Sequence, residues 1–147
     1  MNYWLCITTE ENWNVIKREN IWGVAETWRN TIQKVRPGDK VVIYVMQTRK
    51  DKEVIPSRIT GVFEVISEPF KDSKRIFKSY KSETTFPYRV KLKPLKIFKK
   101  PLFFKELVPE LKFIKNKRFW SGSLRRAMAQ IGERDYNLIV RKGKEYE

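Results

Sequence analysis

The segment around which the fold is organised reads Asn20-Ile21-Trp22-Gly23-Val24, continues through Trp28-Arg29-Asn30, and ends in the turn Arg36-Pro37-Gly38-Asp39-Lys40. Residues 21–30 show neither helical nor strand periodicity, so we expect an irregular loop there. Large aromatic side chains are usually buried, which makes two tryptophans in a loop informative. Trp22 and Trp28 therefore either fill the core or line a pocket for a flat ligand.

A turn and an apolar run follow this segment. Proline fixes φ and glycine tolerates a positive φ, so Pro37-Gly38 predicts a tight turn. Residues 41–45 are continuous, apolar and β-branched, which predicts a strand buried on both faces. Residues 59–66 predict another strand, with a bulge or a close backbone approach at Gly61. The polar residues 47–57 between these strands are expected to form a loop.

Upstream of the segment, a strand and a helix are expected. Residues 3–7, Tyr-Trp-Leu-Cys-Ile, are typical of a strand. Thr8 or Thr9 is expected to cap a helix over residues 10–19, because a hydroxyl can accept a hydrogen bond from the first turn. Asn20 is a suitable end for it, since asparagine tolerates the left-handed conformation. The side chains expected in the core are Trp4, Cys6 and Trp13.

The second half of the chain is basic and less regular. Residues 71–85 are expected to form a long irregular connection. Residues 86–93 alternate, so that one face of a strand is buried (Tyr88, Val90, Leu92) and the other carries cations (Arg89, Lys91, Lys93). Ser121-Gly122-Ser123 is expected to cap a helix whose apolar positions are Leu124, Ala127, Met128 and Ile131. A short docking turn over residues 134–139 and a frayed tail from Arg141 complete the chain.

These elements predict one α+β domain over residues 1–147. About five strands are interspersed with and followed by short helices, and no regular strand–helix alternation indicates a doubly wound sheet. We expect a small mixed, barrel-like sheet flanked by short helices.

The net charge of +15 is unevenly distributed. Residues 71–118 hold 16 basic and 4 acidic side chains, whereas residues 1–70 hold 10 and 9. A one-signed excess confined to the middle of the chain favours a positive face for a polyanion. The alternative is a charged, thermally stable surface, which explains an abundance of both signs better than a positive excess.

Several classes of protein and site are excluded or disfavoured. The absence of histidine excludes a catalytic triad and an imidazole metal site, and one cysteine excludes a cysteine-rich zinc site within the chain. Neither a Walker loop nor a Gly-x-Gly-x-x-Gly motif is present. The sequence has no run long enough to span a membrane and no secretory signal pattern. We therefore expect a cytoplasmic protein, monomeric or weakly homodimeric, without metal or cofactor, and not an enzyme.

The positive indications are aromatic residues among polar groups. A base can stack on an indole while hydroxyls and amides contact its edge. The candidate base-binding residues are Trp22, Gly23, Thr8, Thr9, Trp28, Asn30, Trp120 and Ser121, with Tyr80 as a further aromatic outside the periodic elements. The candidate phosphate-binding residues are Arg89, Lys91, Lys93, Lys117, Arg118, Arg125 and Arg126. The alternative for the strand cations is a solvated face without a ligand.

Eight groups of residues together resemble the EVE domain family, in its order along nearly the whole chain. They are Tyr3-Trp4-Leu5, Glu11-Asn12-Trp13, Trp22-Gly23-Val24, Asn30, Pro37-Gly38-Asp39 with Tyr44, Phe86-Pro87-Tyr88-Arg89-Val90, Phe104-Lys105-Glu106-Leu107 and Asp135-Tyr136. The resemblance implies a PUA-like fold, related to YTH and ASCH domains. YTH domains hold a methylated adenine in an aromatic cage, and EVE domains are thought to hold modified bases, chiefly cytosines in DNA.

By the same resemblance, Trp22 is the tryptophan on which the base stacks, and Thr8 and Thr9 read its edge. The family more often has asparagine at the second of these positions. The second aromatic wall is assigned to Trp28 or Trp120. The resulting hypothesis is a nucleic-acid-binding module that accepts a flipped, modified base. Two alternatives remain: a small hydrolase of modified nucleosides, with a lysine and a carboxylate beside Trp22, and a protein-interaction module with a flat aromatic patch.

Overall fold

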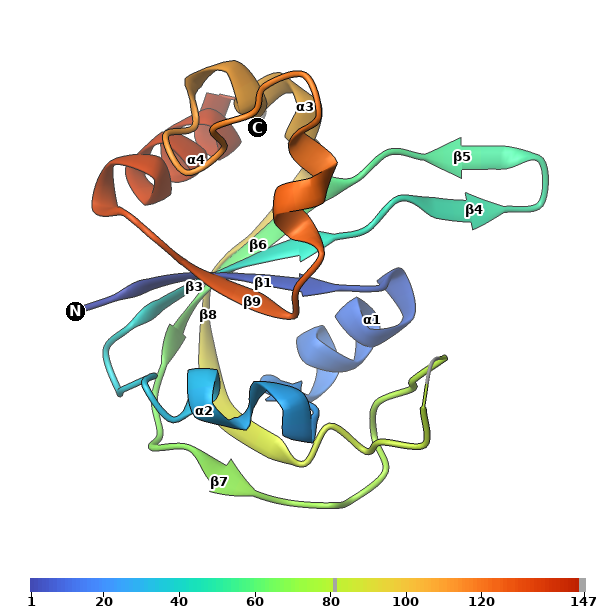
Figure 1. Ribbon diagram of the computed structural model, residues 1–147, viewed down its shortest axis with the longest axis vertical. Coiled ribbons are helices and arrows are strands. Elements are labelled where there is room, and N and C mark those ends of the chain that lie inside the picture. Colours follow the sequence, from blue (N-terminus) through green and yellow to red (C-terminus); the bar gives the residue numbers. More distant parts are fainter. Residues whose placement is uncertain (81, 146–147) are drawn as a thin grey trace.

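The sheet at the centre of the molecule joins strands that are far apart in the sequence. The computed structural model describes residues 1–80 and 82–145, and seven strands of this part form one curled sheet (Figure 1). The strands are β1 (Tyr3–Thr8), β2 (Ile21–Val24), β3 (Lys40–Val45), β6 (Arg58–Val65), β7 (Phe70–Lys71), β8 (Tyr88–Phe103) and β9 (Met128–Ile131). Their order is β2-β8-β6-β3-β1-β9, with β7 paired to β8. β1 and β3 are parallel and the other pairs antiparallel, so the sheet is mixed, as predicted.

Short helices flank the sheet. They are α1 (Glu10–Glu19), α2 (Arg29–Ile32), α3 (Phe104–Leu107) and α4 (Glu133–Glu145), with 3-10 turns η1 (Glu26–Trp28), η2 (Val108–Glu110) and η3 (Trp120–Leu124). The hydroxyl of Thr9 accepts a hydrogen bond from the backbone N–H of Asn12 at 3.2 Å, so Thr9, not Thr8, caps α1. Asn20 ends α1 with φ 56°, as expected. No helix in the described residues is long and apolar enough to cross a membrane.

Two hydrophobic cores lie on opposite faces of the sheet, because side chains alternate along β1 and β3. On one face Trp4 and Cys6 pack with Trp13 of α1 and with α2. On the other face Leu5 and Ile7 pack with α3 and α4. Residues 41–45 of β3 are correspondingly buried on both faces, which confirms the prediction for this run.

The turn before β3 fixes where this strand begins. Gly38 has φ 93°, a conformation that favours glycine. The carboxylate of Asp39 accepts hydrogen bonds from the indole Nε1 of Trp4 at 3.0 Å and from the backbone of Arg36 at 3.0 Å. The predicted turn is therefore confirmed, and it also holds a buried tryptophan in place.

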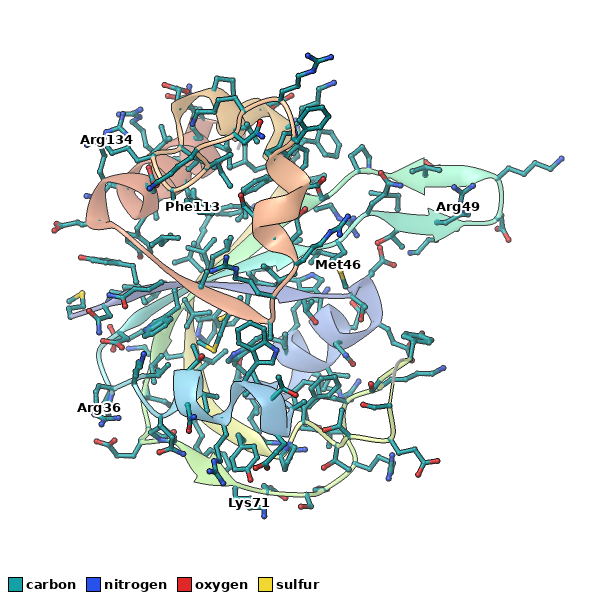
Figure 2. All side chains as sticks on the ribbon, viewed as in Figure 1. Arg36, Met46, Arg49, Lys71, Phe113 and Arg134 are labelled. Atoms are coloured by element: carbon teal, nitrogen blue, oxygen red, sulfur yellow. The ribbon has the colours of Figure 1, made fainter. Side chains whose placement is uncertain are left out.

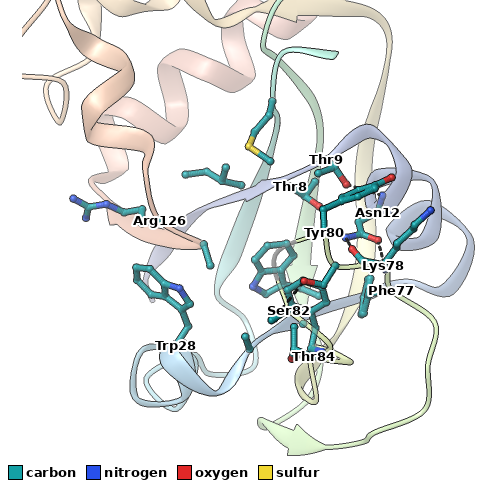
Figure 3. Close-up of a pocket in the computed structure, with 18 of the residues that line it drawn as sticks. Thr8, Thr9, Asn12, Trp28, Phe77, Lys78, Tyr80, Ser82, Thr84 and Arg126 are labelled. Atoms are coloured by element: carbon teal, nitrogen blue, oxygen red, sulfur yellow. Dashed lines mark hydrogen bonds between the residues drawn. The ribbon is translucent and has the colours of Figure 1, made fainter. Parts of the chain in front are cut away.

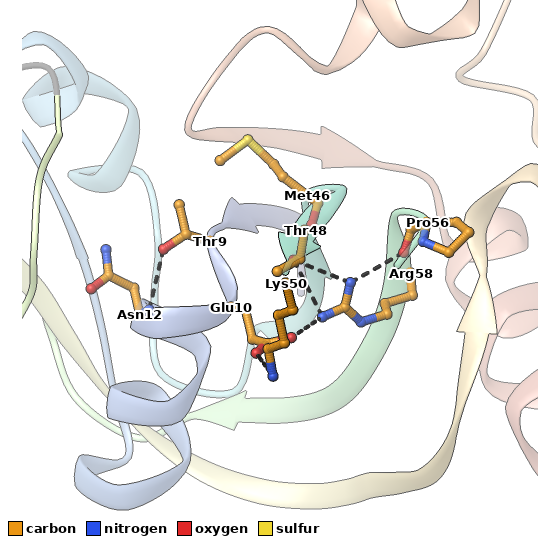
Figure 4. Close-up of polar contacts among 8 residues, drawn as sticks. All are labelled: Thr9, Glu10, Asn12, Met46, Thr48, Lys50, Pro56 and Arg58. Carbon is orange, nitrogen blue, oxygen red and sulfur yellow. Dashed lines mark hydrogen bonds and ion pairs between the residues drawn. The ribbon is translucent and has the colours of Figure 1, made fainter. Parts of the chain in front are cut away.

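The prediction of a loop over residues 47–57 is wrong. These residues contain a hairpin of β4 (Thr48–Lys50) and β5 (Glu53–Ile55). The hairpin projects from the body of the molecule and carries Arg49, an exposed residue of β4 (Figure 1 and Figure 2). The strands lack apolar alternation because neither face packs on a core. At its base, Arg58 donates hydrogen bonds to Glu10 of α1 at 2.7 Å and to the Pro56 carbonyl (Figure 4).

Two predictions near the C-terminus are wrong. The residues expected to form a helix from Leu124 to Ile131 instead end η3 and form β9, which pairs antiparallel with β1. The segment expected to be a turn and a frayed tail is the 13-residue helix α4. Its Gly143 is buried, and a Cβ there would lie 2.4 Å from the ring of Phe98. Gly143 therefore lets the last turns of α4 pack closely against Phe98 of β8.

Candidate functional site

A cavity of about 710 Å³ opens where β1, β2, the start of η1 and the segment before β8 meet. Its aromatic lining residues are Trp22, Trp28, Phe77, Tyr80 and Phe86, and its hydroxyl-bearing ones are Thr8, Thr9, Ser79, Ser82 and Thr84. Three cations also line it: Lys78, Arg125 and Arg126. Figure 3 shows Arg126 and Lys78 on opposite sides of this pocket.

Trp22 is part of both the core and the pocket. It lies on β2 opposite Val90 of β8, so the segment expected to be a loop begins as a strand. Its side chain is only 4% exposed, because most of the indole packs in the core below. The part of the ring that reaches the cavity forms its inner wall. Trp28, half-buried at the end of η1, contributes a second indole.

One wall is made by residues 72–80, which we call the strap. Phe77, Lys78, Ser79 and Tyr80 of the strap line the cavity. The amide of Asn12 on α1 contacts the Lys78 backbone twice, as donor to the carbonyl at 2.7 Å and as acceptor from the N–H at 2.8 Å. The Tyr80 hydroxyl donates to Glu11, and this hydrogen bond raises the pKa of Tyr80 above its ordinary value.

Arg89 is buried beneath the strap. The alternation of β8 is as predicted for Tyr88, Val90 and Leu92, but the prediction that Arg89 lies on an exposed face is wrong, because its side chain is fully covered. Its guanidinium donates to the carbonyls of Lys74 at 2.5 Å, Thr85 at 2.9 Å and Phe86 at 2.9 Å. Burial lowers the pKa of this guanidinium, and the charge of Asp72, 3.6 Å away, acts in the opposite direction. Arg89 fixes the backbone around the pocket instead of presenting a charge to phosphates.

Gly23 serves the same wall. A Cβ at this position would lie 2.8 Å from the carbonyl oxygen of Phe86 and 3.0 Å from Cε2 of Phe77. The sequence predicts Gly23 as a base-binding residue. The space beside its Cα is instead filled by Phe77 and the backbone of Phe86, while Gly23 itself lines the cavity.

Some predicted site residues lie elsewhere. Trp120 is partly buried against the core on the other face of the sheet, where its ring is tilted against that of Phe104 with centroids 5.4 Å apart. Of the two candidates for a second aromatic wall, only Trp28 therefore lines the cavity. Ser121 and Asn30 lie outside the lining, and Asn30 is exposed on α2. The other cations outside the lining are exposed: Lys91, Lys93, Lys117 and Arg118. Those that the structure does bring together with the aromatic residues are Arg125 and Arg126.

The pocket also bears on the two alternative hypotheses. A flat aromatic patch does not match a concave cavity with a buried Trp22. The hydrolase alternative requires a lysine and a carboxylate beside Trp22. Among the described lining residues no Asp or Glu is present. Lys78 of the lining pairs with Glu11 at 3.8 Å, and both side chains are about half exposed.

The sequence did not predict the strap or the role of Asn12, which holds the strap by its backbone. Phe77, Lys78 and Thr84 lie in a segment without periodicity, so no pattern marks them as lining residues. Asn12 does carry a signal. It lies four residues before the buried Ile16 and therefore on the inward face of α1, where an amide requires a partner.

The curled mixed sheet flanked by short helices has the PUA-like fold that the resemblance implies. The chain belongs to the EVE domain family, whose model matches residues 2–142. A UPF0310 protein of Pyrococcus abyssi is 51% identical over 140 residues, covering 95% of this chain and 97% of the relative.

Two solved structures support the same fold. The human THYN1 protein in complex with DNA containing 5-methylcytosine has a TM-score of 0.62 at 13% identity, and the alignment covers 98% of each chain. The MmI1 YTH domain has a TM-score of 0.60 at 17% identity, with 99% of this chain and 95% of that domain covered. The expected relation to YTH domains is therefore confirmed at the level of the fold.

Proposed function

We propose that this EVE domain is a nucleic-acid-binding module that accepts a flipped, modified base between Trp22 and Trp28. The observation that carries this proposal is the composition of the pocket: aromatic rings inside, hydroxyls along the walls, and cations at opposite sides. Its volume of about 710 Å³ lies within the usual range for small-ligand sites, roughly 300–1,000 Å³.

The energetics are favourable for such a ligand. Removing a base from its stack costs a few kcal/mol, and stacking on an aromatic side chain returns about 1–3 kcal/mol per base. Arg125 and Arg126 line the same cavity and supply charge for the adjoining phosphates. The fold similarity to a protein solved with 5-methylcytosine DNA is consistent with the proposal and makes 5-methylcytosine the first base to test.

The proposed role of the pocket is to bind a base and not to catalyse a reaction. The lining offers stacking surfaces, hydroxyls and positive charge, which select and hold a base. A modified group adds apolar area to a neutral base, and an aromatic pocket rewards that addition by burial. We therefore expect recognition to depend on the modification more than on the neighbouring sequence.

The test is a panel of oligonucleotides that differ only in one modified or unmodified base. We expect at least one modified oligonucleotide to bind more tightly than its unmodified counterpart. Trp28→Ala should weaken that binding about tenfold, since it removes one stacking surface from a half-buried position. Phe119→Ala is the matched control, because this exposed aromatic is not among the lining residues. Equal affinity of the wild type for every member of the panel would contradict the proposal.

A further inference from the structure

The strap has little regular secondary structure of its own, yet it supplies one wall of the pocket. Residues 72–80, which follow the short strand β7, form neither helix nor strand. Such segments open more readily than sheets unless other elements hold them. Side chains that reach it from regular elements provide this hold: Asn12 and Glu11 from α1, and Arg89 from β8.

Arg89 fastens the base of the strap. Its guanidinium contacts the carbonyl of Lys74, near the start of the strap, and the carbonyl of Thr85, beyond the end of the strap. It also lies over the ring of Phe77, 5.4 Å from its centroid. These contacts fix where the strap leaves and rejoins the body of the protein. They do not reach Lys78 or Tyr80.

Asn12 fastens the part of the strap nearest the ligand. It is only 6% exposed, and its amide pairs with both backbone groups of Lys78 (Figure 3). The backbone N–H of Lys78 must donate, which assigns Oδ1 of Asn12 to face it and leaves Nδ2 for the carbonyl. The residues on either side of this contact, Phe77 and Ser79, both line the cavity.

We propose that Asn12 is a positioning residue for base selection: by holding the Lys78 backbone it fixes Phe77 and Tyr80 as a wall of the pocket. This inference rests on the proposed function of the cavity. Asn12 contributes no charge, and Arg125 and Arg126 come from a different segment, between η3 and β9. Loss of Asn12 therefore affects recognition of the modified base and leaves the charge-driven affinity for nucleic acid in place.

The experiment compares Asn12→Ala with Asn14→Ala, an exposed asparagine on the same helix, as full-length proteins. The measured quantities are the affinities for a matched pair of oligonucleotides, with and without 5-methylcytosine, and the amide hydrogen exchange of Lys78 and of strand β3. For Asn12→Ala we expect the ratio of the two affinities to fall about tenfold, because unpaired backbone groups destabilise the wall. We also expect exchange at Lys78 to accelerate while exchange in β3 is unchanged. Asn14→Ala should match the wild type in each measurement.

A second variant covers the case in which Asn12→Ala does not fold. Asn12→Asp keeps the acceptor for the Lys78 N–H but places an oxygen against the Lys78 carbonyl, so the affinity ratio should fall in the same direction. An unchanged ratio in whichever variant folds, with slow exchange at Lys78, would overturn the positioning role. A wild-type protein that does not distinguish the two oligonucleotides would refute the choice of base before either variant is measured.

Discussion

Gly23 of β2 and Phe77 of the strap are in contact, with room for no Cβ between them. A methyl group at position 23 would lie 3.0 Å from Cε2 of Phe77 and 2.8 Å from the backbone oxygen of Phe86. Both neighbours belong to the pocket lining. The pocket wall therefore depends on a glycine in the adjacent strand.

Gly23→Ala is predicted to destabilise the protein by about 1–3 kcal/mol, because the Phe86 backbone cannot move aside as easily as a side-chain end. Chemical denaturation measures the change, and base-specific binding should weaken in parallel. Gly122→Ala is the control, since a Cβ there meets nothing within 4 Å. Equal stability of the two variants would show that the wall adjusts freely.

Arg89→Lys is predicted to lower the free energy of unfolding by about 3 kcal/mol, because buried carbonyls lose charged donors that a lysine cannot replace together. Lys91→Met, an exposed change on the same face of β8, should shift it by less than about 0.5 kcal/mol. Urea titrations compare the two. A small effect at Arg89 would contradict its assignment as the anchor of the strap.

Arg125→Gln and Arg126→Gln are each predicted to reduce the slope of log affinity against log salt by about 1, as expected for the loss of one phosphate contact. Arg141→Gln on α4 should leave the slope unchanged, since Arg141 is exposed and is not a lining residue of this pocket. The measurement is a binding titration at several salt concentrations. Slopes that respond equally to all three changes would indicate that binding is not localised at the pocket.

The ion pair between Lys40 of β3 and Glu64 of β6, 2.7 Å apart, predicts an acid-dependent contribution to stability. The hydrogen bond and charge of Lys40 lower the pKa of the Glu64 carboxyl. A carboxyl with a lowered pKa stabilises the fold above its unfolded value of about 4.3, and this stabilisation is lost as the pH falls through the folded pKa. Between about pH 6 and pH 3, the Tm of the wild type should therefore fall more than that of Glu64→Gln. Parallel thermal scans test this, and identical curves would contradict it.

The strands on which the cores are built were predictable because their side chains report burial locally. Residues 41–45 are apolar at every position since both faces are covered, and every second residue of β8 from Tyr88 to Leu92 is apolar and buried. The turn at Pro37-Gly38 and the helix end at Asn20 were also predictable, because single residues there adopt conformations that few others tolerate.

The errors occur where a distant segment decides the structure. Arg89 looks like a solvent-facing cation until the strap, which has no periodicity, covers it. The apolar spacing of Leu124, Met128 and Ile131 also fits a helix, but pairing with β1 makes the last two part of a strand. The sequence marks Trp22 as a central residue, but no pattern in it predicts that the strand of Trp22 pairs with β8.

The NMR resonances of the five tryptophan indole N–H groups can show directly whether a base enters the pocket between Trp22 and Trp28. Trp22 and Trp28 line the pocket. The indole N–H of Trp4 instead donates a hydrogen bond to Asp39, and Trp120 packs on the other face of the sheet. On saturation with the tightest-binding modified oligonucleotide, we expect the resonances of Trp22 and Trp28 to shift and those of Trp4 and Trp120 to stay in place. Shifts at Trp120 with Trp22 and Trp28 unchanged would contradict this expectation.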